Sequence, residues 1–113
     1  QAAAAVGFAL DADYYNHLLA DYAARRELLC GALAEAGFTF TVPQGAYYVL
    51  AGYGALSDRD DVTFARWLAA EGGVATVPGS SFYHKRSADG RALVRFAFCK
   101  RTETLERAAE RLA

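Results

Sequence analysis

The feature that most constrains the fold is an apolar run over residues 92–98, which a single cation interrupts. Side chains alternate between the two faces of a β-strand, so every second residue from Val94 to Phe98 would point to one face. Arg95 would point to the opposite face, between apolar neighbours. The run therefore predicts a strand in a sheet that has one face packed on a core and one face that carries an arginine.

Hydrophobic periodicity predicts the other elements of the chain. Asp11 or Asp13, Asp60 or Asp61, and Thr102 are candidate N-caps of helices. The predicted helices cover residues 2–10, 12–36, 61–71 and 103–113, and the predicted strands cover residues 38–42, 46–51, 74–77 and 92–98. This order favours a two-layer α+β domain with one mixed, mostly antiparallel sheet and helices packed on one of its faces.

The composition is that of one ordinary globular domain, since 54% of the 113 residues are hydrophobic and 22% are charged. The net charge is -1 and no basic stripe is present, which argues against a nucleic-acid partner. No apolar stretch approaches the roughly 20 residues of a membrane helix, so we expect no membrane partner. Cys30 and Cys99 lack metal-ligand spacing and fit free thiols in a reducing cytoplasm.

The first predicted helix, residues 2–10, contains only Ala, Val, Gly, Phe and Leu and has no N-cap residue before it. A helix that is apolar on every side is expected to be buried against something. We therefore expect that Gln1 is a cut point and that an upstream part of the protein is missing. The alternative is a terminal helix docked on this same domain.

Arg95 is the leading candidate for a ligand contact. A guanidinium among small apolar neighbours can bind a carboxylate with two parallel hydrogen bonds, and partial exclusion of water strengthens that pairing. A cross-strand salt bridge explains the same residue equally well, and the pattern alone leaves both interpretations open.

Other chemistry has little support in the sequence. His17 and His84 have no third partner at metal-ligand spacing, so we expect no metal site. Ser80 and Ser81 lack the strand-to-helix turn that activates a serine nucleophile. The long polar segment 78–90 is typical of a functional loop, although a surface turn packed by its own aromatic residues is the simpler explanation.

Three ordered segments resemble the C-terminal part of class I/II pyridoxal-phosphate aminotransferases, most closely the kynurenine and methionine aminotransferase branch. They are Val-Pro-Gln-Gly-Ala-Tyr-Tyr at residues 42–48, Val-Pro-Gly-Ser-Ser-Phe-Tyr at 77–83 and Val-Arg-Phe-Ala-Phe-Cys-Lys at 94–100. The resemblance spans essentially the whole chain and continues through the helix start at residues 100–105.

This resemblance implies roles for two residues and an organisation for the chain. Arg95 would bind the α-carboxylate of the amino acid and 2-oxo acid substrates, and Tyr47 would be an aromatic residue near the substrate. Residues 1–36 would be helices that link to a large upstream cofactor domain. Residues 37–113 would form the sheet and covering helices of the small domain.

The resemblance also implies pyridoxal 5'-phosphate as the cofactor of a full-length, homodimeric cytoplasmic enzyme. Lys85 and Lys100 do not stand in the sequence context of the family's Schiff-base lysine, so we expect neither to hold the cofactor. We accordingly expect no catalytic, cofactor-binding or metal residue in this segment, and no activity of the segment alone. The alternative is a non-catalytic regulatory module that binds an amino acid, or a dimerisation module.

Overall fold

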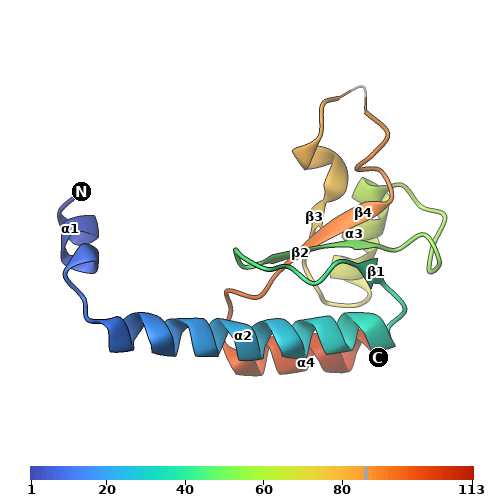
Figure 1. The fold of residues 1–113 in the computed structure, drawn as a ribbon. Helices are drawn as coiled ribbons and strands as arrows, with labels where there is room; N and C mark the ends of the chain where they lie inside the picture. Colours follow the sequence, from blue (N-terminus) through green and yellow to red (C-terminus); the bar gives the residue numbers. More distant parts are fainter. Residues whose placement is uncertain (86) are drawn as a thin grey trace.

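The computed structural model describes residues 1–85 and 87–113 (Figure 1). These residues form four α-helices, a short 3-10 helix and one four-stranded sheet. The helices are α1 (Ala2–Phe8), α2 (Ala12–Glu35), α3 (Asp61–Ala70), the 3-10 helix η1 (Gly79–Phe82) and α4 (Thr102–Leu112). The strands are β1 (Thr39–Phe40), β2 (Tyr48–Gly52), β3 (Val77–Pro78) and β4 (Leu93–Ala97).

All predicted helices and strands are present, although β1 and β3 are shorter than predicted. Segment 78–90, predicted to be irregular, contains η1, and its residue Arg86 lies outside the described residues. The strand order is β1-β2-β4-β3, and all three pairings among them are antiparallel. This confirms the α+β prediction and makes the described sheet wholly antiparallel.

The core lies on one face of the sheet, beneath which α2 and α4 run side by side (Figure 1). Alternate residues of β2 and β4 point into this core, as the period-two pattern predicted. They meet apolar side chains from α2, α3 and α4. The largest fully buried side chains of the core are Leu33, Val49, Tyr53, Phe64, Val94 and Phe98.

Two of the predicted N-caps are confirmed. The carboxylates of Asp11 and Asp60 each accept a hydrogen bond of 3.0 Å from the backbone N–H three residues further along, which satisfies a free donor at the helix start. The prediction for Thr102 is wrong, because α4 begins at that residue and Arg101 occupies the N-cap position without a side-chain bond. The exposed first turn of α4 can instead be solvated by water.

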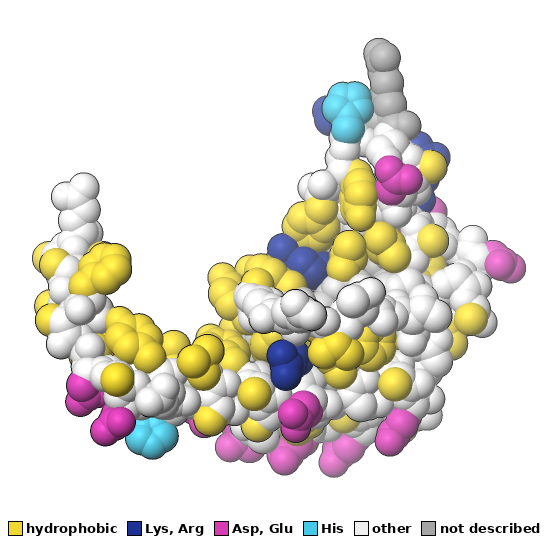
Figure 2. All heavy atoms as spheres, in the orientation of Figure 1, with side chains coloured by type: hydrophobic (Ala, Val, Ile, Leu, Met, Phe, Trp, Pro, Cys, Tyr) yellow, Lys and Arg dark blue, Asp and Glu magenta, His cyan; other side chains and the backbone are white. Residues whose placement is uncertain are grey.

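Helix α1 and the first turns of α2 project from the rest of the chain as an arm (Figures 1 and 2). No residue of α1 is buried, and the Phe8 side chain is 90% exposed. The radius of gyration is 16.0 Å, whereas a compact domain of this length has about 13 Å. The rest of this chain therefore does not bury α1, although its apolar composition predicts burial.

No helix among the described residues is long and apolar enough to cross a membrane.

Candidate carboxylate-binding site

Arg95 lies at the centre of the sheet face that no helix covers. Its cross-strand neighbours are Leu50 on β2 and Val77 on β3, so neither adjacent strand offers it a carboxylate. Among residues 1–85 and 87–113, no salt bridge involves Arg95. The cross-strand salt bridge that the sequence left open is thus not found in the described structure, and the guanidinium charge has no carboxylate partner there.

Two aromatic rings pack against the Arg95 guanidinium. The Cζ atom lies 4.0 Å from the centroid of the Tyr48 ring and 4.3 Å from the centroid of the Phe82 ring. Aromatic rings attract a cation and restrict the rotation of its side chain. These contacts hold the charge on the sheet without neutralising it.

Tyr47 lies in the turn before β2, and its ring stacks on the Tyr22 ring of α2, with centroids 6.3 Å apart. The residue before it, Ala46, has φ of 59°, in the left-handed region that is uncommon for a residue with a side chain. The rings of Tyr47 and Tyr48 have their centroids 4.4 Å apart. Hydrogen bonding and charge interaction with Tyr48 raise the pKa of Tyr47 above its ordinary value. Tyr48 thus contacts both Arg95 and Tyr47, the two site residues that the sequence resemblance implies, while Tyr47 also contacts α2.

A hollow of about 490 Å³ opens beside these residues. Its walls come from the turn at residues 41–44 and from Tyr48 and Leu50 of β2. Arg95 does not line this hollow, but two of the lining residues border it, because Tyr48 contacts Arg95 and Leu50 is its cross-strand neighbour. Figure 2 shows basic side chains set among hydrophobic ones on this concave side of the molecule. A small ligand with one anionic group and an apolar remainder suits this surface.

Sequence reasoning missed the residues that support this site. The sequence places Tyr48 and Phe82 in the segments 42–48 and 77–83 without indicating a contact with Arg95, and it offers Asp61 only as a candidate helix cap. In the structure Asp61 is buried, and its Oδ2 accepts a hydrogen bond of 2.8 Å from the backbone N–H of Ser80 in η1. The alternation in β4 places Arg95 on the open face, but no local pattern indicates that Phe82 or Asp61 would contribute from elsewhere in the chain.

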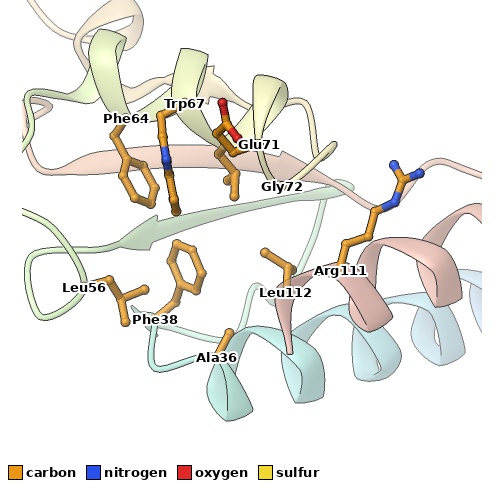
Figure 3. Close-up of a pocket in the computed structure, with 10 residues that line it drawn as sticks. Ala36, Phe38, Leu56, Phe64, Trp67, Glu71, Gly72, Arg111 and Leu112 are labelled. Carbon is orange, nitrogen blue, oxygen red and sulfur yellow. The ribbon is translucent and has the colours of Figure 1, made fainter.

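Another hollow, of about 370 Å³, lies between α3 and the ends of α2 and α4 (Figure 3). Phe38, Leu56, Trp67 and Leu112 give it mostly apolar walls, and Arg111 lies at its edge. The Arg111 Nη1 atom donates to the Gly73 carbonyl oxygen, 2.8 Å away. The hollow therefore has apolar lining without a convergent set of reactive groups, and we assign no chemistry to it.

Among the described residues, the acidic, histidine and cysteine side chains form neither a metal-binding group nor a disulfide. The described residues contain no group of three or more His, Cys, Asp or Glu that could hold a metal ion. Cys30 and Cys99 are free thiols, and burial raises the pKa of the Cys30 thiol although nearby Arg26 opposes this effect. A raised pKa keeps that thiol protonated and poorly nucleophilic at neutral pH.

Comparison with known proteins identifies the family. The profile of "Aminotransferase class I and II" matches residues 1–112. The chain belongs to this family. Methionine aminotransferase of Escherichia coli is 38% identical over 88% of this chain and 25% of its own length. Kynurenine–oxoglutarate transaminase of Dictyostelium discoideum is 30% identical over 88% of this chain and 27% of its own length.

Solved aminotransferases share the fold. The structure of N-succinyldiaminopimelate aminotransferase from Mycobacterium tuberculosis matches with a TM-score of 0.87 and 33% identity, over 98% of this chain and 29% of that one. An Escherichia coli structure described as a methionine aminotransferase matches with a TM-score of 0.81 over 88% of this chain and 26% of that one. This aminotransferase chain thus spans about a quarter of the length of its curated relatives, 25% and 27% for the two above.

The lysines of the chain do not fit pyridoxal phosphate, the cofactor of this aminotransferase family. Lys85 lines a hollow with Asp60 and Asp61, and Lys100 lines another hollow against α4. Neither lines the hollow that adjoins Arg95, and both side chains are exposed. A Schiff base needs an amine beside the bound substrate. We therefore assign no cofactor-holding role to either lysine.

Proposed function

We propose that this chain is the small C-terminal part of a pyridoxal-phosphate-dependent aminotransferase and that Arg95 binds the α-carboxylate of its substrates. The enzyme would transfer an amino group between an L-amino acid and a 2-oxo acid. Both substrates carry the same carboxylate, so one arginine would serve both halves of the reaction. The observation that carries the proposal is the unpaired guanidinium, held by two rings on the open face of the sheet.

The chemistry of the guanidinium supports this assignment. With rings packed against its faces, the hydrogen-bond donors that remain are the N–H groups at its edge, whose fork matches the two oxygens of a carboxylate. Apolar neighbours on both adjacent strands, Leu50 and Val77, lower the local polarity and strengthen a charge pair there. A bound carboxylate would replace water without displacing any ion pair among the described residues.

The surroundings of Arg95 support a small organic substrate. The adjoining hollow has apolar and amide walls that can accommodate the rest of an amino acid. Tyr47 is 41% exposed, and its ring contacts Tyr48, so it can close one side of the bound substrate. Together they would orient the substrate with its carboxylate on Arg95.

The cofactor and its lysine would belong to the rest of the enzyme. When bound, pyridoxal phosphate supplies an electron sink for bond changes at the substrate's α-carbon. Residues 1–36 would connect to that cofactor domain, which agrees with the exposure of apolar side chains along α1 and the first turns of α2. We expect the full enzyme to be a cytoplasmic homodimer and this segment alone to be inactive.

The test is Arg95→Ala in the enzyme that carries this chain, with KM and kcat measured for an amino acid and for a 2-oxo acid. Loss of a charge-assisted pair of about 1.5–3 kcal/mol should lower kcat/KM roughly 10- to 150-fold. Arg95→Lys should also weaken binding, because an ammonium group cannot reproduce the planar fork. Unchanged kinetics for both substrates would refute the carboxylate role.

Arg59→Ala is a matched control. The Arg59 guanidinium also packs on an aromatic ring, with its Cζ 5.1 Å from the centroid of the Trp67 ring, but away from Arg95. Its removal should leave KM unchanged.

The competing proposal, a non-catalytic amino-acid-binding or dimerisation module, is favoured by the exposed apolar arm. It predicts amino-acid binding or self-association without transamination, even in the longest protein that carries this chain.

A further inference from the structure

The two rings on Arg95 are held by different parts of the chain. Tyr48 is on β2, in register with Ala97, so the sheet itself fixes its place beside β4. Phe82 is the last residue of η1, and 46% of its side chain is exposed. Packing therefore holds Phe82 only weakly, and its position over Arg95 depends on the backbone of η1.

The geometry of the rings limits how a ligand can approach. The ring centroids lie 4.0 and 4.3 Å from the Arg95 Cζ, so the two rings limit the directions from which a ligand can reach the guanidinium. A carboxylate would bind at the N–H groups that the rings leave uncovered. If Phe82 moves away, one face becomes accessible to water and the side chain gains rotational freedom.

A buried carboxylate holds η1 in place. Asp61 is only 3% exposed and is the one charged residue that is buried in the described part of the chain. Its Oδ2 lies 2.8 Å from the backbone nitrogen of Ser80, the second residue of η1. Burial of a carboxylate is costly without hydrogen bonds, and this bond, together with the N-terminal dipole of α3, favours the charge there.

A close backbone contact between Gly79 and Gly90 holds the beginning of η1 in place. A Cβ atom at Gly79 would lie 2.4 Å from the carbonyl oxygen of Gly90, and one at Gly90 would lie 2.6 Å from the carbonyl carbon of Gly79. The two segments can approach so closely because glycine, which has no Cβ, occupies both positions. The contact fixes where η1 begins, and the bond to Asp61 fixes the direction in which it continues toward Phe82.

We propose that Asp61 is a positioning residue for the carboxylate site: through the Ser80 N–H it holds η1 so that Phe82 covers one face of Arg95. This proposal rests on the proposed function for its effect on substrate binding. The contact chain itself, from Asp61 to Ser80 to Phe82 to Arg95, stands on the geometry above. Asp60, the adjacent carboxylate, caps α3 through Thr63 and forms no hydrogen bond with η1 among the described residues.

The test compares Asp61→Ala, Asp61→Asn and Asp60→Ala in the enzyme that carries this chain. Asp61→Ala should raise KM for the amino acid about fivefold to tenfold and leave kcat within about twofold, because a contact common to the bound and reacting states is weakened. Asp61→Asn keeps an oxygen that can accept from Ser80 N–H and should restore KM. Asp60→Ala removes a helix cap on the same turn and should leave KM unchanged.

A second readout follows Arg95 directly. Rings above and below a guanidinium shift its Nε–H proton resonance upfield, and the Arg95 signal is assigned by its disappearance in Arg95→Ala. Asp61→Ala should move this resonance toward its random-coil position, whereas Asp60→Ala should not. Phe82→Leu, at a half-exposed position that cannot unfold the core, should reproduce both the resonance shift and the rise in KM even if Asp61→Ala does not fold.

The outcomes separate the two proposals. If Arg95→Ala leaves KM unchanged but Asp61→Ala still shifts the Arg95 resonance, the carboxylate function fails and the positioning of Arg95 stands. If Arg95→Ala raises KM but Asp61→Ala and Phe82→Leu change neither KM nor the resonance, the positioning role is overturned. Failure of Asp61→Asn to restore KM would also overturn it, because the charge and not the hydrogen bond would then be responsible.

Discussion

The two faces of β2 and β4 are built from alternate residues of the same strands, yet they differ in almost every property. On the covered face, Val49 and Val94 have no exposed surface and Phe96 is 3% exposed. On the open face, Leu50 is 37% exposed, and Arg95 carries a charge with no carboxylate partner among the described residues. The strands thus combine a packed core and a ligand surface within one layer.

This difference indicates what each face contributes. Burial of apolar surface stabilises the fold by roughly 25 cal/mol per Å² and requires no particular ligand. A rigidly held charge on the opposite face adds little to stability but is ready to bind an anion. We therefore expect substitutions on the covered face to change the free energy of unfolding, and those on the open face to change substrate binding.

The largest effect on stability is expected from Phe96→Ala. The Phe96 ring contacts the Phe38 ring edge to face, with centroids 5.4 Å apart. Its removal leaves a cavity in the core and should lower the free energy of unfolding by about 3–5 kcal/mol. Urea denaturation followed by far-UV circular dichroism measures this change. A loss below about 1 kcal/mol would show that the covered face tolerates a large deletion, and the contrast between the faces would disappear.

Much of this contrast could be predicted from the sequence. The alternation in residues 92–98 separates the core residues from Arg95, and helical periodicity locates the three covering helices. The bounds of the short strands β1 and β3 could not be predicted. Only two residues of each strand form sheet pairs, but the residues that flank them have a strand-like composition as well. The exposure of α1 in this chain also could not be predicted, since an all-apolar pattern does not say which surface would cover it.

The residues that hold Arg95 in place are harder to predict from sequence patterns than Arg95 itself. Adjacent acidic residues before a helix predict a cap, and Asp60 is that cap, but nothing local distinguishes Asp61 as the residue that turns inward to η1. The packing of Phe82 on Arg95 joins residues from η1 and β4, whose relative placement depends on tertiary structure. Sequence patterns thus identify Arg95, the proposed binding group, more readily than the residues that hold it.

The buried hydroxyl of Tyr53, the residue after β2, tests whether the covered side of the sheet excludes water. The Tyr53 ring stacks on Phe64, with centroids 3.9 Å apart, and its hydroxyl lies 2.9 Å from the Arg59 carbonyl oxygen and 3.0 Å from that of Arg91. Tyr53→Phe leaves these carbonyls without that donor and should cost about 1–3 kcal/mol of unfolding free energy near neutral pH. Urea denaturation at pH 8 measures the loss.

The same variant predicts a pH dependence. Burial, with smaller contributions from Asp61 and Asp60, raises the pKa of Tyr53 to about 12, whereas an unfolded tyrosine titrates near 10. The unfolded chain therefore loses this proton first, and the stability that Tyr53 contributes is present below about pH 10 and declines as the pH approaches 12. The difference in stability between the original chain and Tyr53→Phe should narrow over this interval. A constant difference would mean that the phenol is hydrated.

The smallest effect on stability is expected at Leu50, although it lies one residue from the fully buried Val49 on the same strand. Leu50→Ala removes a side chain that is already 37% exposed, so it leaves a wider hollow beside Arg95 and no closed cavity. The free energy of unfolding should fall by less than about 1 kcal/mol, while KM for amino acids with large apolar side chains should change more than KM for alanine. A loss comparable to that of Phe96→Ala would mean that the open face also stabilises the fold, because a side chain with no structural role cannot cost as much as one in the core.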